Sequence, residues 1–170
     1  LRKVWCASST HNSEEIFCGK VHKELKKKYK NLLTIIIPRH IERTKIIQNE
    51  LEKLKLKIQT HEQKKNIQND TDIYIVNSYG KTKAFYKHCQ NVFLGGSLIN
   101  HGGQNPLEAA RYGCNVLHGP NIDNFKEIYK FLKKNKISSK INNYKITADK
   151  LNKLFLKKNS SQKIQKKLYL

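Results

Sequence analysis

The run Leu32-Leu-Thr-Ile-Ile-Ile37 is the feature of this sequence that most restricts the fold. It is apolar almost throughout and rich in β-branched residues, which is typical of a strand buried on both faces of a parallel sheet. Shorter apolar runs alternate along the chain with segments of helical periodicity, and this alternation predicts βαβ units. The fold class that follows is α/β, with a doubly wound parallel sheet.

The other elements follow from the same patterns. We expect strands at 4–8, 32–37, 56–58, 72–76, 92–94 and 115–118. Helices are expected at about 13–29, directly after 38–40, and at 81–88, 105–112 and 125–134. The polar stretch 60–70 predicts an exposed loop, and the Lys-rich segment from Thr147 onward predicts one or two terminal helices.

The sequence predicts further details of two helices. Asn12, with Glu15 three residues later, is expected to cap the first helix. The helix after 38–40 is amphipathic, and four apolar residues are expected on its buried side: Ile46, Ile47, Leu51 and Leu54.

Segment 92–111 joins a strand to a helix through a loop that holds four of the eight glycines: Gly95, Gly96, Gly102 and Gly103. Asn105 is expected to cap the helix, with Pro106 at its first position. Glycines permit close backbone approach and a helix start presents unpaired N–H groups, so the loop suits an anionic ligand, which Glu108 would face. The alternative is a glycine-rich connection that binds nothing. The loop matches neither the dinucleotide fingerprint nor a P-loop.

Polar turns follow five of the expected strands, at 8–11, 38–40, 77–80, 95–105 and 119–124. Because the carboxyl ends of parallel strands meet at one edge of the sheet, where such folds bind ligands, we expect the turns to gather there. A phosphate-bearing ligand would then meet Arg39 and the glycine loop, with Glu108 at its sugar hydroxyls.

Each of these side chains also has a plainer interpretation. Arg39 is equally suited to a surface salt bridge. His40 and His101 are expected to be solvated rather than catalytic. Ser8 and Ser9 are expected to cap a helix rather than to attack a substrate, because neither lies in a Gly-x-Ser-x-Gly elbow.

The chain is strongly basic, with 34 Lys and Arg against 13 Asp and Glu and a formal net charge of +21. Nearly all of the excess is Lys, and Ile and Asn are also abundant, so compositional bias with solvated lysines is the favoured interpretation. A patch that faces an anionic membrane or another anion is the alternative. A nucleic-acid-binding module is disfavoured, because aromatic residues are not interleaved with the basic runs.

Four cysteines, Cys6, Cys18, Cys89 and Cys114, show no Cys-x-x-Cys spacing and are expected to be free and mostly buried. No metal site is expected. No apolar run approaches the roughly 20 residues that span a bilayer, and no signal peptide is visible. Because strand-like residues begin at Leu1, which is not Met, we expect the chain to be a fragment.

Five motifs together resemble those of the 3-deoxy-D-manno-octulosonic acid (Kdo) transferases. They are Ala7-Ser-Ser-Thr-His11 with Glu14-Glu15, Ile37-Pro-Arg-His-Ile-Glu-Arg43, Phe93-Leu-Gly-Gly-Ser-Leu98, Gly102-Gly-Gln-Asn-Pro-Leu-Glu108 and Gly119-Pro-Asn-Ile-Asp-Asn-Phe125. The resemblance runs from about Val4 to Phe131 and keeps the family's order of motifs.

The resemblance implies the Rossmann-like C-terminal half of a GT-B glycosyltransferase. Residues 1–145 would form the donor-binding domain and 146–170 a helical tail, with the N-terminal acceptor domain absent from this chain. The donor would be CMP-Kdo and the acceptor a lipid A precursor of lipopolysaccharide. The whole enzyme would work at the cytoplasmic face of the inner membrane, anchored by its N-terminal part, and would not bind nucleic acid.

The resemblance also implies site residues. Pro38 and Arg39 match the family's Pro-Arg pair at the CMP site, and Asn105, Pro106, Leu107 and Glu108 match its Asn-Pro-Leu-Glu element, whose carboxylate binds the ribose. Tyr79, Gly80 and Lys81 stand at a Met-Gly-Glu element that lines the nucleotide, where Tyr79 and Lys81 depart from the pattern. Asn77-Ser78 replaces an Asp-Thr pair, and Gln104 a common His. A donor loop would comprise Gly95, Gly96, Ser97, Gly102 and Gly103.

The implied mechanism is inverting transfer, with a carboxylate base on the absent domain and therefore no catalytic residue in this chain. This half would stabilise the CMP leaving group through positive charge and helix-terminal amides, without metal or cofactor. Three alternatives stay open: a donor domain for another nucleotide sugar such as UDP-N-acetylglucosamine, a basic nucleic-acid-binding module, and a degenerate, non-catalytic domain.

Overall fold

The computed structural model describes residues 1–157 and 161–168, so the parts of the expected tail at 158–160 and 169–170 lie outside the described residues. The described residues form one seven-stranded sheet. Its strands are β1 (Lys3–Thr10), β2 (Leu32–Pro38), β3 (Ile58–Thr60), β4 (Ile73–Ile75), β5 (Asn91–Leu94), β6 (Asn115–His118) and β7 (Ser138–Lys140).

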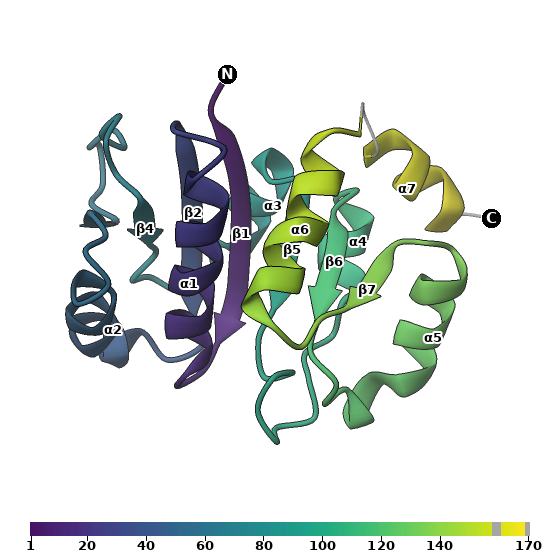
Figure 1. Cartoon of the computed structure of the whole chain (residues 1–170). Coiled ribbons are helices and arrows are strands. Elements are labelled where there is room, and N and C mark those ends of the chain that lie inside the picture. The colour runs from purple at the N-terminus through teal and green to yellow at the C-terminus, as the bar shows by residue number, and fades with distance from the viewer. Residues whose placement is uncertain (158–160, 169–170) are drawn as a thin grey trace.

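All neighbouring strands are parallel, in the order β3-β4-β2-β1-β5-β6-β7. The strand order reverses at β1, because the chain first adds strands on the β2 side and later adds β5, β6 and β7 on the other (Figure 1). The predicted doubly wound parallel sheet is confirmed. Such a reversal leaves a crevice beyond the carboxyl ends of the two strands that flank it, here β1 and β5.

Helices cover both faces of the sheet (Figure 1). On one face lie α1 (Glu14–Lys26), α2 (Thr44–Glu52) and α6 (Tyr144–Phe155); on the other lie α3 (Thr82–His88), α4 (Leu107–Arg111), α5 (Lys126–Lys134) and α7 (Ser161–Leu168). Short 3₁₀ turns, η1 (Ile41–Arg43) and η2 (Asp123–Phe125), precede α2 and α5.

Two apolar cores follow from the alternation of side chains along the strands. Trp5 and Ala7 of β1 point into the core beneath α1 and α6, whereas Cys6 between them points into the core beneath α3 and α4. Ala148 and Leu151 of α6 belong to the first core and Ile164 of α7 to the second. All four cysteines are free and buried, as the sequence predicts. No helix of the described residues is long and apolar enough to cross a bilayer.

The structure corrects several local predictions. β7 was not predicted, because its sequence Ser-Ser-Lys carries no apolar pattern. Ile46 is 56% exposed, because it precedes Ile47 by one position and a helix turns by about 100° per residue, so only Ile47 and Leu51 are buried. The helix expected at 105–112 is shorter: α4 begins at Leu107, and Pro106 lies just before it.

A buried polar network joins α1 to the sheet at the amino-terminal end of β4. The Asp72 carboxylate accepts hydrogen bonds from Lys26 and, at 2.8 Å, from the backbone amide of Lys57. His22, fully buried, places Nε2 3.3 Å from Asp72 Oδ1 and Nδ1 2.8 Å from the Thr34 hydroxyl. Burial alone would raise the pKa of Asp72, but hydrogen bonds from His22, Lys26 and Lys57 lower it well below its usual value.

Asp72→Asn is expected to lower the free energy of unfolding at pH 7 by about 1–3 kcal/mol, because it removes a charged acceptor from three donors. The pKa of Asp72 is lower in the folded chain than the unfolded value of about 3.9. This stabilisation is therefore present above pH 3.9 and is lost as the pH falls toward the folded pKa. Urea unfolding of both proteins at pH 7 and pH 3 should show the difference narrowing at the lower pH.

Asp70→Asn is the matched control. Asp70 is exposed and binds the Lys57 side chain at 2.6 Å, so its replacement should change stability far less. If both substitutions lowered the free energy of unfolding equally, the buried network would not be what stabilises the fold through Asp72.

Candidate functional site

The turns that follow β1, β2 and β5 meet at the reversal of strand order. The Arg39 amide donates to the Thr10 carbonyl at 3.0 Å, and the Gly95 amide donates to the Ser8 carbonyl at 2.8 Å. The loop after β5 then packs so closely on the end of β1 that a Cβ on Gly95 would lie 2.2 Å from the Ser9 carbonyl oxygen. Gly95 is thus required by this close approach, and three of the five polar turns, those after β1, β2 and β5, gather at one edge as expected.

Glu14, in the first turn of α1, occupies the centre of this edge. Its side chain is fully buried, and Oε2 accepts hydrogen bonds from the His11 and Gly96 amides, both at 2.9 Å. Oε1 accepts from the Ser97 amide at 3.2 Å and the Leu98 amide at 3.0 Å. The loop amides that suggested a cradle for a ligand's phosphate therefore hold an internal carboxylate.

The expected capping pair of Asn12 and Glu15 is not formed. Ser13 precedes α1 with a φ of 73° and makes no side-chain cap, while Glu14 reaches back to the His11 amide. Glu15 instead faces Arg43, whose Nη1 lies 3.0 Å from Glu15 Oε1. Burial raises the pKa of Glu15, and Arg43 counteracts that effect. The buried contacts of these two acids were not predicted, although an acidic pair directly after a strand and its turn was a signal for them.

A cavity of about 490 Å³ opens at the same edge. Residues from the end of β1, from α3, from β5 and from the segment around the start of α4 line it, among them Ser9, Tyr86, Gln104, Asn105, Leu107 and Glu108. Ser8 is buried beside it and accepts a 2.7 Å hydrogen bond from the Tyr86 hydroxyl, so Ser8 does not cap a helix as predicted. Burial raises the pKa of Tyr86, which keeps this hydroxyl a donor.

The predicted Asn-Pro-Leu-Glu element supplies one wall of the cavity. The Asn105 side chain accepts from the Leu107 amide at 3.0 Å, which fixes the turn into α4. Glu108 follows in the first turn of α4, with its side chain 45% exposed and 3.9 Å from Lys83 Nζ. Its carboxylate is therefore available to a ligand's hydroxyl groups.

The predicted residues of the turns after β2 and β4 are not among those that line the cavity. Pro38 is buried at the end of β2, and Arg39 beside it is exposed and forms no ion pair with a described residue, so the alternative salt bridge is not formed. Tyr79 is 63% exposed in the turn after β4, next to Gly80 and Lys81.

The two halves of the glycine loop close on each other. The Gly103 amide donates to the Gly96 carbonyl at 2.8 Å, and Gly102 accepts from the Asn124 amide at 3.1 Å. Gly102 has a φ of 94°, and a Cβ there would lie 2.4 Å from the Asn124 side chain. The second glycine pair therefore serves packing against η2.

Three histidines gather beside the loop. The ring of His11 lies 4.4 Å from that of His101 and 5.8 Å from that of His40, measured between centroids. His40 and His101 are exposed, as predicted, whereas His11 is buried. In the described part of the chain, no group of three or more His, Cys, Asp or Glu residues is arranged to hold a metal ion.

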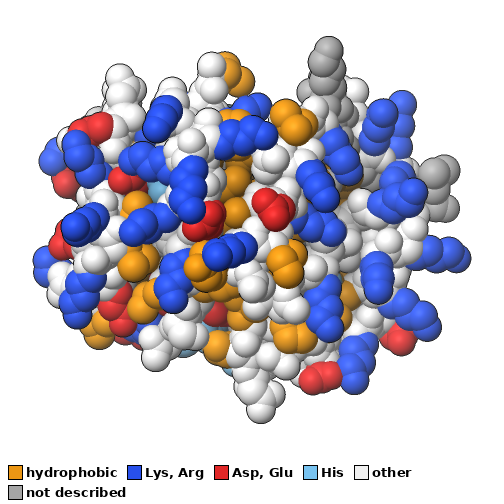
Figure 2. Space-filling view, in the orientation of Figure 1, with side chains coloured by type: hydrophobic (Ala, Val, Ile, Leu, Met, Phe, Trp, Pro, Cys, Tyr) orange, Lys and Arg blue, Asp and Glu red, His pale blue; other side chains and the backbone are white. Residues whose placement is uncertain are grey.

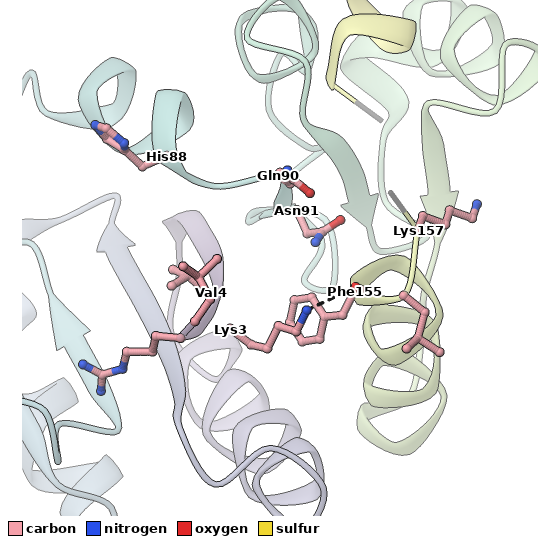
Figure 3. Close-up of a pocket in the computed structure, with 10 residues that line it drawn as sticks. Lys3, Val4, His88, Gln90, Asn91, Phe155 and Lys157 are labelled. Atoms are coloured by element: carbon pink, nitrogen blue, oxygen red, sulfur yellow. Dashed lines mark hydrogen bonds between the residues drawn. The ribbon is translucent and has the colours of Figure 1, made fainter. Parts of the chain in front are cut away.

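A second cavity, of about 440 Å³, lies at the opposite, amino-terminal edge of the sheet (Figure 3). Lys3 and Phe155 meet there through a 3.3 Å hydrogen bond from Lys3 Nζ to the Phe155 carbonyl, and His88 and Gln90 come from the segment before β5. None of the five motifs contributes a residue to the lining of this second cavity, so we place the ligand site in the first cavity.

Basic side chains are not concentrated at one place on the face that carries α1 and α6. Figure 2 shows Lys and Arg side chains spread over this whole face, with acidic side chains among them, rather than gathered over one element. This distribution agrees with solvated lysines as the main cause of the net charge.

Comparison with known proteins supplies a family context. No family model matches the chain. It is 36% identical to a 3-deoxy-D-manno-octulosonic acid transferase of Haemophilus influenzae, over 77% of this chain and 31% of the relative. It is 31% identical to the transferase of the same name from Aquifex aeolicus, over 87% of this chain and 40% of the relative. The chain thus spans less than half the length of these curated relatives.

The fold is also that of a solved structure. The C-terminal CMP-Kdo binding domain of WaaA from Acinetobacter baumannii matches 99% of this chain and 88% of its own length, with a TM-score of 0.86 and 23% identity. The predicted fold, that of the C-terminal half of a GT-B glycosyltransferase, is confirmed. The resemblance to Kdo transferases that the motifs predict is confirmed over most of the chain.

Glu14→Gln is expected to lower the free energy of unfolding by about 2–4 kcal/mol, because an amide NH₂ would face N–H groups that now donate to a carboxylate. The loop should loosen as well, so hydrogen exchange at the Gly96, Ser97 and Leu98 amides should accelerate. Urea unfolding and exchange measured by NMR check the two effects.

Glu24→Gln on the same helix is the matched control. Among the described residues Glu24 pairs only with Lys27, at 2.8 Å on the helix surface, so its loss should cost about 0–1 kcal/mol and leave loop exchange unchanged. Similar behaviour of the two variants would show that Glu14 does not organise the loop.

Proposed function

We propose that this chain, a relative of the Kdo transferases, is the donor-binding half of a glycosyltransferase that transfers Kdo from CMP-Kdo to a lipid A precursor. The observation that carries the proposal is the cavity beside β1 and β5, one wall of which is the Asn105–Glu108 element. Crevices at this position hold nucleotides in doubly wound folds. The similarity of the chain to two Kdo transferases supports CMP-Kdo as the ligand.

The cytidine would occupy the cavity, with its ribose hydroxyls donating to Glu108. Hydrogen bonds of a hydroxyl to a carboxylate are charge-assisted and short. Glu108 lies in the first turn of α4, directly after the turn that the Leu107 amide and the Asn105 side chain fix by their hydrogen bond. Leu107 would shape a wall of the cavity, with Pro106 before it in the chain, and Pro38 would position Arg39. Tyr79 and Gly80, exposed on the turn after β4, and the half-buried Lys81 would close over the nucleotide from the β4 side.

The phosphate is assigned to Arg39 rather than to the glycine-loop amides. The Gly96 and Ser97 amides already donate to Glu14, whereas the Arg39 guanidinium is exposed at the same edge and unpaired within the described residues. A guanidinium can bind a phosphate in a bidentate manner. Gly95, Gly96, Ser97, Gly102 and Gly103 would then act as the scaffold of the donor site.

The chemical contribution of this half would be electrostatic. As the bond between Kdo and CMP breaks, negative charge develops on the departing phosphate, and Arg39 would stabilise that charge in the transition state. The carboxylate base that activates the acceptor, and the contact with the inner membrane at its cytoplasmic side, would belong to the N-terminal part of the enzyme. Residues 1–145 and the helices that follow would then serve together as the donor module.

CMP is expected to bind the chain at least about tenfold more tightly than UDP, measured by calorimetric titration at pH 7.5. Glu108→Ala and Arg39→Ala should each weaken CMP binding by about 10-fold or more, because each removes a charge-assisted contact. Glu127→Ala, an exposed acid in the first turn of α5, is the control and should bind CMP as the unaltered chain does.

Two results would overturn the proposal. Preference for UDP would assign the domain to another nucleotide sugar. Retention of full CMP affinity by both Glu108→Ala and Arg39→Ala would show that the cavity is not the nucleotide site.

A further inference from the structure

His11 carries an unsatisfied polar atom at the reversal of strand order. The residue is 8% exposed, and its Nδ1 lies 3.0 Å from the Ser9 carbonyl oxygen, which assigns the proton of the neutral ring to Nδ1. Its Nε2 is buried and has no hydrogen-bond partner among the described residues. A buried nitrogen without a partner costs free energy, so a ligand that supplies one is favoured at this position.

The rings of His11 and His101 lie close to the backbone of Gly96. His11 Cε1, the atom next to Nε2, would lie 3.3 Å from a Cβ at Gly96, and His101 Cδ2 only 2.9 Å from it. Both rings therefore lie against the bare backbone of Gly96. His101 is the exposed ring of the pair, so it is the one that is free to turn away from His11.

The histidines adjoin the cavity that contains Glu108. Ser9, whose carbonyl binds His11, lines that cavity. Gln104 lines it too, and its Nε2 would lie 3.3 Å from the same Cβ position at Gly96. A nucleotide bound with its ribose at Glu108 would thus extend its phosphate and sugar toward His11.

We propose that His11 and His101 form the subsite for an oxyanion of the donor, reached when His101 turns aside and His11 Nε2 donates a hydrogen bond to it. The inference rests on the proposed function, because it takes the donor to be CMP-Kdo. Two oxyanions of that donor fit the chemistry: the phosphate and the carboxylate of the sugar acid. Each is an acceptor that a protonated imidazole satisfies through a charge-assisted hydrogen bond.

Donation from Nε2 requires that His11 takes up a proton when the ligand binds. In the free chain, burial lowers the pKa of His11, which favours the neutral ring. Glu14, with Oε2 3.8 Å from Nδ1, favours the charged ring, whereas His101 and His40 oppose it when they are protonated. An oxyanion at Nε2 adds a second negative charge and shifts the balance toward the imidazolium.

Calorimetric titration at pH 7.5 in two buffers of different ionisation enthalpy measures both affinity and proton uptake. The unaltered chain is expected to take up protons on binding. His11→Gln should abolish that uptake and weaken binding by about 10- to 100-fold, as loss of a charged hydrogen bond does. Weakening with CMP itself assigns the subsite to the phosphate. Weakening with CMP-Kdo alone assigns it to the sugar carboxylate.

His101→Ala and His88→Ala complete the design. His101 is exposed, so its removal should leave the thermal unfolding midpoint unchanged. It should weaken binding of the same ligand, because the ring that has turned aside contacts the oxyanion as the second member of the subsite. His88 is an exposed histidine at the opposite edge of the sheet (Figure 3), and its removal should change neither affinity nor proton uptake. If His11→Gln does not fold, His101→Ala and the proton uptake of the unaltered chain decide the matter.

Different results would overturn the histidine subsite and the proposed function. Binding of CMP and CMP-Kdo without proton uptake, and with full affinity in His11→Gln and His101→Ala, overturns the histidine subsite and leaves the proposed function intact. Absence of binding of either ligand to the unaltered chain overturns the proposed function and the subsite with it.

Discussion

The hydrogen bonds of the Glu14 carboxylate hold together the parts of this fold that the candidate site uses. They join the first turn of α1 to the loop after β5, and the backbone of His11 to both. A fully buried carboxylate is costly unless several donors satisfy it, and four amides do so here. The start of α1 adds a favourable field, because the helix dipole is positive at that end.

Other features of the edge depend on this arrangement. The fixed backbone at His11 sets the position of its ring against Gly96, and the fixed loop carries Gln104 and Asn105 to the cavity. Gly95 contributes in a different way, since the absence of a side chain lets the loop contact the end of β1. The geometry of the site is therefore set mainly by backbone contacts, and the half-exposed Glu108 carboxylate that faces the cavity is available to a ligand.

The sequence predicted those parts of the fold that depend on local pattern. The β-branched run of β2 and the alternation of apolar and helical segments specify a parallel sheet, and the turns after its strands specify the ligand edge. β7 escaped prediction because its three residues are polar, and it forms through tertiary contacts, above all its pairing with β6. The sequence also did not predict which group accepts hydrogen bonds from the loop amides. The glycine spacing indicates that the loop presents amides to an anion, but not whether that anion belongs to a ligand or to a side chain of α1. The histidine cluster is tertiary as well, since its members come from three separate turns.

The reversal of strand order at β1 has a consequence for the assembly of the chain. The two sides of the site come from β1 and β5, and the contact between Glu14 and Gly96 spans 82 residues of sequence. Closing so long a loop is entropically costly, and contacts of high sequence separation form late in folding. β1, β2 and β4 can pair before β5 joins them, but that partial sheet contains no cavity and leaves the Glu14 carboxylate without three of its four donors. Completion of the sheet and creation of the binding site are therefore one event, and a chain that folds only halfway holds no partly formed site.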